Sequence, residues 1–155
     1  MTPTHAEAHT LPFEAGFFDA IVSIDAYQYL GTADLYLGYL IDFVRDAGRI
    51  GAVVPALKTE LGNKPPTELA AFWQSEFCCW HSPAWWRHHW TKTGKVTVDH
   101  VDLIEDGWRD WARFNDYITP LVEGWWIDEV ATTHDMLQSD QGKNLGFTRI
   151  TATKT

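Results

Sequence analysis

The sequence of 155 residues predicts one α/β domain with about four strands, the last of them antiparallel, flanked by helices. Two short apolar runs, 18–24 and 49–54, enclose a segment with helical spacing. This order is typical of a right-handed strand–helix–strand unit. Apolar and polar residues alternate over 146–152, which is typical of an antiparallel strand. We therefore expect a single domain over residues 1–155, with three strands that could be parallel and a reversed last strand.

The first strand–helix–strand unit can be justified element by element. The run at 18–24 is almost continuously apolar, as in a strand that is buried on both faces. Thr32 is a suitable N-cap for the helix that follows, whose apolar positions extend to Val44 at helical spacing, and Gly48 ends it. The second strand, 49–54, is expected to end at Pro55.

The second half of the chain is rich in tryptophan, and all nine tryptophans lie after residue 72. Ser82 followed by Pro83 indicates a helix start, because serine caps the helix and proline fits its first turn. Trp86 and Trp90 lie one turn apart, and we expect both to face the core. The expected elements are a helix from Thr67 to Phe77, a helix from Pro83 to Gly94, a strand over 96–101, helices over 107–118 and 121–137, and the strand at 146–152.

Composition excludes several classes of function. Twenty-one acidic and 12 basic residues give a net charge of −9, which argues against nucleic acid as a partner. No apolar run is long enough to span a membrane, and the N-terminal residues lack the pattern of a secretory signal. Cys78 and Cys79 are adjacent and predict no disulfide framework, so we expect a cytoplasmic protein.

Polar residues follow the first predicted strand directly. Asp25, Tyr27 and Gln28 come at its carboxyl end, where open α/β sheets bind their ligands. Asp25 could equally cap the following turn without any role in binding. The outer members of the pairs Trp85-Trp86 and Trp125-Trp126 are candidates for lining a pocket or an interface.

Several motifs occur in a recognisable order. Leu11-Pro12-Phe13 precedes the run that begins at Phe18, and Gly48 to Pro55 follows the first helix. Phe72-Trp73, His81 to Arg87 and Asp106-Gly107-Trp108 continue the order downstream. In these segments the sequence resembles the C-terminal half of the class I S-adenosylmethionine-dependent methyltransferases, which implies a partial Rossmann-like sheet.

The resemblance also implies a function. It implies methyl transfer from S-adenosylmethionine to a small-molecule acceptor. The family's glycine-rich cofactor loop has no counterpart in the sequence, which contains no Gly-x-Gly-x-Gly. We therefore expect the chain to be a truncated or fragmentary form, the C-terminal portion of a methyltransferase-like fold, in which cofactor binding by the chain alone is in doubt. The alternative is a non-catalytic, dimeric binding or structural descendant.

The resemblance assigns cofactor contacts position by position. Glu7 would accept a hydrogen bond from the adenine amino group, at a position where the family usually has aspartate. Ala8 would offer its backbone N–H to the adenine edge, and Leu11 would lie near the ring. Ser23 to Asp25 would approach the methionine part of the cofactor.

The same resemblance indicates the acceptor side. Tyr27 and His81 are the candidate catalytic residues, His81 as a general base whose ordinary pKa lies near neutrality. Gln28 and Trp85 are the candidate substrate-binding residues.

A metal site is not expected. Cys78-Cys79-Trp80-His81 invites a zinc interpretation, but the spacing lacks two ligand pairs separated by two to four residues. A weaker third interpretation is a metal-dependent hydrolase that uses His81 and Cys79.

The first strand also predicts an assembly. Without a neighbour on its outer side, 18–24 would leave an open apolar edge, and such an edge is a template for another chain. We expect a homodimer in which this strand pairs antiparallel with its own copy.

Overall fold

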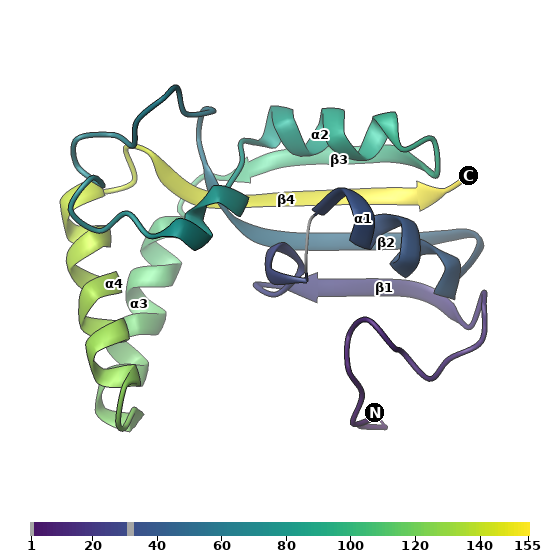
Figure 1. Cartoon of the computed structure of the whole chain (residues 1–155), viewed down its shortest axis with the longest axis horizontal. Helices are drawn as coiled ribbons and strands as arrows, with labels where there is room; N and C mark the ends of the chain where they lie inside the picture. The colour runs from purple at the N-terminus through teal and green to yellow at the C-terminus, as the bar shows by residue number, and fades with distance from the viewer. Residues whose placement is uncertain (1, 31–32) are drawn as a thin grey trace.

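The computed structural model describes residues 2–30 and 33–155 (Figure 1). Thr32, the predicted N-cap of the first helix, lies outside the described residues. The longer elements are β1 (Phe18–Ile24), α1 (Ala33–Leu40), β2 (Val44–Leu57), α2 (Pro83–Lys92), β3 (Val96–Ile104), α3 (Gly107–Ile118), α4 (Trp126–Asp140) and β4 (Leu145–Lys154). Short 3-10 helices lie at Tyr27–Tyr29, Ile41–Phe43, Ser75–Cys79 and Thr119–Leu121.

The four strands form one mixed sheet in the order β1-β2-β4-β3. β1 runs parallel to β2, with Ile21 opposite Ile50. β4 is antiparallel to both neighbours, so that Ile150 lies between Ala52 and Val101. β1, β2 and β3 therefore share one direction and the last strand opposes them, as the sequence predicts.

The main core lies between one face of the sheet and the helices α1 and α2, which both lie on that face in Figure 1. Trp86 and Trp90 are fully buried there, which confirms that both face inward. The Ser82 hydroxyl accepts a hydrogen bond from the Trp85 N–H at 3.2 Å, which confirms the predicted cap of α2. Ile50 and Ile150 complete this core from the two central strands.

A second core lies where α3 and α4 extend beyond the end of the sheet (Figure 1). It consists of Leu57, Leu69, Phe77, Trp80, Met136, Leu137 and Leu145. The buried Asn115 amide of α3 donates to the Val130 carbonyl of α4 at 2.7 Å, which ties the two helices together. The buried Asp140 carboxylate accepts from the Asn144 and Leu145 N–H groups, which fixes the turn into β4.

β1 differs from its prediction. Val22 and Ile24 are 71% and 70% exposed, so the expectation of a strand buried on both faces is wrong for the described chain. These side chains point away from the face that α1 and α2 cover, while Ile21 packs against the core. β1 is also the end strand of the sheet, and within residues 2–30 and 33–155 no backbone hydrogen bond joins another segment to its outer edge.

Other boundaries differ as well. β2 begins at Val44 and passes through Pro55, which lies opposite Phe147. Pro55 is tolerated because β1 ends opposite Val53, so β2 has a neighbouring strand on only one side at that point.

The remaining differences concern helices. The helix expected from Thr67 to Phe77 does not form in the described chain, which has turns there and then the 3-10 helix at Ser75–Cys79. The helix expected over 121–137 begins five residues later, at Trp126, after the 3-10 turn at Thr119–Leu121. Within the described ranges, no helix has the length and apolar character that crossing a membrane requires.

Candidate functional site

The carboxyl end of β1 is marked by an unusual backbone conformation at Asp25. Its φ of 51° lies in the left-handed region, which non-glycine residues rarely adopt. The Asp25 N–H donates to the Val53 carbonyl at 2.8 Å, and its carboxylate accepts from the Gln28 amide at 3.1 Å. Burial raises the pKa of Asp25. A partly buried carboxylate on a strained backbone, at the strand end where α/β sheets bind ligands, is a candidate binding group.

The segment predicted to meet adenine is held in place by α1 and by its own hydrogen bonds. The Glu7 carboxylate accepts from the His9 backbone N–H at 2.7 Å and lies 3.0 Å from His9 Nδ1. These bonds lower the pKa of Glu7 and raise that of His9. Glu7 therefore stays an ionised acceptor. The other imidazole nitrogen of His9 is 3.1 Å from the Leu30 carbonyl, which places this segment beside the exit from β1.

Two tyrosines of α1 fix the rest of that segment. The Tyr36 hydroxyl donates to the Ala8 carbonyl at 3.0 Å, and the Leu11 N–H donates to the Tyr39 hydroxyl at 2.7 Å. The structure therefore places Glu7, Ala8 and Leu11 on one side of α1.

The predicted acceptor-side residues next to Asp25 are buried. Tyr27 is 1% and Gln28 is 2% exposed. The Tyr27 ring meets Tyr36 and Trp86 in edge contacts at 5.6 and 5.9 Å, so it lies in the main core. Ser23, also predicted to approach the cofactor, is half-buried on β1 opposite Ala52. Tyr29, which the sequence analysis does not single out, lines a pocket.

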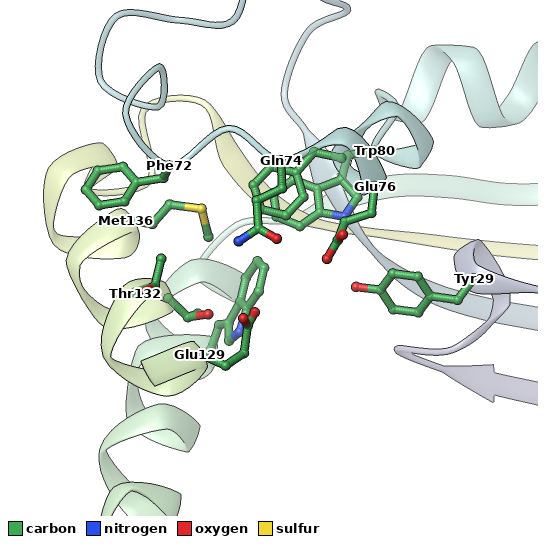
Figure 2. Close-up of a pocket in the computed structure, with 11 residues that line it drawn as sticks. Tyr29, Phe72, Gln74, Glu76, Trp80, Glu129, Thr132 and Met136 are labelled. Atoms are coloured by element: carbon green, nitrogen blue, oxygen red, sulfur yellow. The ribbon is translucent and has the colours of Figure 1, made fainter. Parts of the chain in front are cut away.

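That pocket lies between the exit from β1, the 3-10 helix at Ser75–Cys79 and α4 (Figure 2). Tyr29, Glu76 and Glu129 direct polar groups into it from these three elements. Burial raises the pKa of Tyr29, so its hydroxyl remains a neutral donor. The lining residues are Tyr29, Phe72, Gln74, Glu76, Phe77, Trp80, Trp111, Glu129, Thr132, Thr133 and Met136. Sequence spacing could not find this pocket, because its walls come from segments about a hundred residues apart.

His81 and Trp85 form a stacked pair at the start of α2. Their rings are 3.6 Å apart and nearly parallel, at 6°, and Trp85 also stacks on the buried His89 at 4.4 Å. His81 Nδ1 lies 3.0 Å from a Glu60 carboxylate oxygen. Burial alone would raise the pKa of Glu60, but hydrogen bonds from Ser82 and His81 lower it. Glu60 therefore remains ionised and orients the imidazole, which is the arrangement that a general base requires.

A groove lies on the sheet face that α1 and α2 leave open. Its lining is mostly apolar and comprises Ile24, Asp25, Val53, Ile104, Gly107, Asp110, Trp111, Phe114 and Phe147. Trp111 of α3 lines both this groove and the pocket of Figure 2, and Asp25 lines the groove. The pocket of Figure 2 and this groove thus both lie at the carboxyl end of β1.

The cysteine–histidine segment does not form a metal site in the described chain. No group of three or more His, Cys, Asp or Glu side chains that could hold a metal occurs among residues 2–30 and 33–155. Burial raises the pKa of Cys79 to about 11, so its thiol is protonated at neutral pH. A protonated thiol is a poor nucleophile, which disfavours Cys79 as an attacking group.

Comparisons with known proteins rest on structure alone. No protein-family model matches the sequence, and no curated protein matches it. Phosphoethanolamine N-methyltransferase 2 of Haemonchus contortus, in complex with S-adenosyl-L-methionine, gives a TM-score of 0.70 at 16% identity, covering 96% of this chain and 36% of that one. The geranyl diphosphate C-methyltransferase of Streptomyces coelicolor, in complex with Mg²⁺, geranyl diphosphate and S-adenosyl-L-homocysteine, gives 0.65 at 13% identity, covering 97% and 51%. The cyclase SpnF gives 0.63 at 14% identity, covering 97% and 54%.

These similarities establish the fold over a limited length. The chain spans between 36% and 66% of the first structures that it matches, although almost all of the chain takes part. Over the part that it spans, the chain has the α/β fold of the S-adenosylmethionine-dependent methyltransferases.

Proposed function

We propose that this chain takes part in the transfer of a methyl group from S-adenosylmethionine to a small-molecule acceptor. The observation that carries the proposal is the convergence at the end of β1. The strained carboxylate of Asp25, the fixed Glu7 segment and the aromatic pocket all lie at this end of a methyltransferase fold. In open α/β sheets this is the end that binds ligands.

The residues present fit two parts of such a cofactor. Glu7 offers an ionised and exposed acceptor, which suits the amino group of adenine. Asp25 offers a partly buried carboxylate on the groove side, which suits the positively charged methionine part. The two methyltransferases above bind S-adenosyl ligands in proteins of this fold, which supports the assignment.

When bound, S-adenosylmethionine supplies a methyl group on a positively charged sulfur, and the acceptor provides the electron pair for the new bond. The part left to the chain is alignment of the acceptor and removal of its proton where it carries one. We assign the proton removal to His81, which Glu60 and Trp85 hold in one orientation. On the side of the main core, we assign Tyr27, Gln28 and Trp85 to the part of the site that holds the acceptor.

Calorimetric titration of the chain with S-adenosylhomocysteine tests the proposal. We expect saturable binding at micromolar to millimolar concentration, with one site per chain. The absence of any heat of binding at millimolar ligand would contradict the proposal for this chain.

The alternative is a binding or structural protein of the same fold that performs no chemistry. The open apolar edge of β1 favours it, because such an edge suits assembly. Assembly without binding of S-adenosylhomocysteine would support this alternative.

A further inference from the structure

We propose that the pocket of Figure 2 binds a small organic ammonium ion that also carries an oxygen atom able to accept a hydrogen bond. The proposal goes beyond the proposed function and does not depend on it, because it assigns a ligand to this pocket without making that ligand the acceptor of the methyl group. The binding itself follows from the pocket's charge, its aromatic walls and one unpaired donor.

The first argument is the charge of the pocket. Glu76 enters it from the 3-10 helix at Ser75–Cys79, and Glu129 enters from the first turn of α4 (Figure 2). No lysine, arginine or histidine is among the lining residues. Neither carboxylate forms an ion pair or a hydrogen bond within the part of the chain that the structure describes. Two unneutralised carboxylates at one small hollow attract a cation, and the net charge of −9 reinforces that field.

The second argument is the aromatic wall. The rings of Phe77 and Trp80 stack at 3.8 Å, and Trp111 meets Trp80 in an edge contact at 5.7 Å. The stacked faces of Phe77 and Trp80 cover each other, and the ring surfaces of the lining that remain, including those of Phe72 and Trp111, attract ammonium groups. Metal ions such as Ca²⁺ instead require six or more oxygen ligands, and the described residues provide no metal-binding group of side chains. The lining therefore favours an organic cation.

The third argument is an unpaired donor. Trp80 is 3% exposed, and its indole Nε1 has no hydrogen-bond partner among the described residues. Figure 2 shows this nitrogen on the pocket side of the ring. A buried N–H without an acceptor is costly, and a hydroxyl or carboxylate oxygen on the ligand would satisfy it. The ligand therefore needs an oxygen as well as a positive charge.

Choline is a suitable probe, because it combines a quaternary ammonium group with a hydroxyl oxygen. We expect calorimetry of the chain to show saturable choline binding. The neutral isostere, in which a carbon atom replaces the nitrogen, should bind at least about tenfold more weakly, since it lacks the attraction to the rings and carboxylates. Equal affinity for the two ligands, or no saturable choline binding, would overturn the proposal.

Two sets of variants locate the site. The double variant Glu76→Gln/Glu129→Gln should weaken choline binding at least about fivefold, whereas Glu105→Gln, an exposed acid outside the pocket, should leave it unchanged. Trp80→Phe keeps an aromatic ring but removes the donor. It should weaken choline binding and leave the binding of tetramethylammonium, which has no oxygen, unaltered. Choline binding that is unaffected by the double variant would place the cation elsewhere and refute the site.

The same preparation separates this proposal from the proposed function. Choline binding without S-adenosylhomocysteine binding would retain the cation site and reject the methyl transfer. S-adenosylhomocysteine binding without choline binding would do the reverse. A circular dichroism spectrum of each variant shows that it is folded before the titrations are compared.

Discussion

Asp25 combines two features that oppose stability. Its left-handed φ of 51° strains an L-residue, and its carboxylate is partly buried at the exit from β1. The hydrogen bond from Gln28 offsets only part of that burial, since the pKa of Asp25 remains raised. Costs of this kind persist where the surrounding structure or a function requires the group.

Asp25→Asn should therefore stabilise the chain at pH 7. Asparagine tolerates the left-handed conformation and its side-chain oxygen still accepts from Gln28, while the buried charge is removed. Because the carboxyl is partly open to solvent, we expect a gain below about 1 kcal/mol. The folded-state pKa is raised above its unfolded value, so the gain should fade as pH decreases through the folded pKa and vanish when both states are protonated. Thermal melts of both proteins between pH 7 and pH 3 measure this, and a gain that grows at low pH would contradict the assignment.

Glu7→Gln tests the adenine contact. The variant keeps the length of the side chain but replaces an ionised acceptor with an amide that binds more weakly. We expect the dissociation constant of S-adenosylhomocysteine to rise about tenfold to a hundredfold. Glu14→Gln, an exposed glutamate in the next loop, serves as the control. An unchanged affinity in Glu7→Gln would remove Glu7 from the cofactor site.

The helix α2 illustrates how local signals and packing agree at the level of one element. Its start is fixed by the Ser82 cap and by Pro83 in the first turn. Its inner face carries Trp86 and Trp90, which pack on Tyr27 at the centre of the main core.

Trp90→Ala should destabilise the chain by about 3 to 5 kcal/mol, because it empties a tryptophan-sized site that no solvent reaches. Trp125→Ala is the matched control, since Trp125 is 67% exposed and should cost less than about 1 kcal/mol. Urea unfolding of the two variants gives the comparison. Similar losses in both would mean that the inner face of α2 has been misassigned.

The sequence predicts the elements that depend on nearby residues, but it does not predict features that depend on packing between distant segments. α2 follows from its Ser82 cap and α3 from helical spacing, and the directions of the strands follow from the apolar runs, whereas their order in the sheet does not. The exposure of Val22 and Ile24 could not be predicted, because it depends on what lies over the second face of the sheet. The pocket of Figure 2 also escaped prediction, because Tyr29, Glu76 and Glu129 converge only after α4 packs against the end of the sheet.

At the scale of the whole molecule, the sheet is asymmetric. One face carries α1 and α2, whereas the other leaves Val22 and Ile24 open at the end strand. Backbone N–H groups alternate in direction along a strand, and the Asp25 N–H points to β2. Those of Val22 and Ile24 therefore point outward, away from β2.

We propose that this edge pairs with a second copy of β1 in an antiparallel, twofold arrangement. Light scattering at micromolar protein and physiological salt should then give about 35 kDa, twice the chain mass of 17.7 kDa. Higher salt should favour the dimer, because each chain carries a charge of −9 and salt screens the repulsion between the two chains.

Val22→Pro removes an outward N–H without breaking the pairing with β2, so it should yield a folded monomer. A monomeric parent protein would refute the dimer.

The position of β4 has a consequence for biosynthesis. β4 follows β1, β2 and β3 along the sequence, yet it lies between β2 and β3 and pairs with both. During translation, β1 and β2 can pair and α2 can form, but β3 has no neighbouring strand until β4 has left the ribosome. Until that moment the edges of β2 and β3 that β4 covers are unpaired, and the inner face of α2 is exposed. The chain should therefore depend on chaperones late in its synthesis, and premature termination before β4 should leave an aggregating product rather than a smaller folded one.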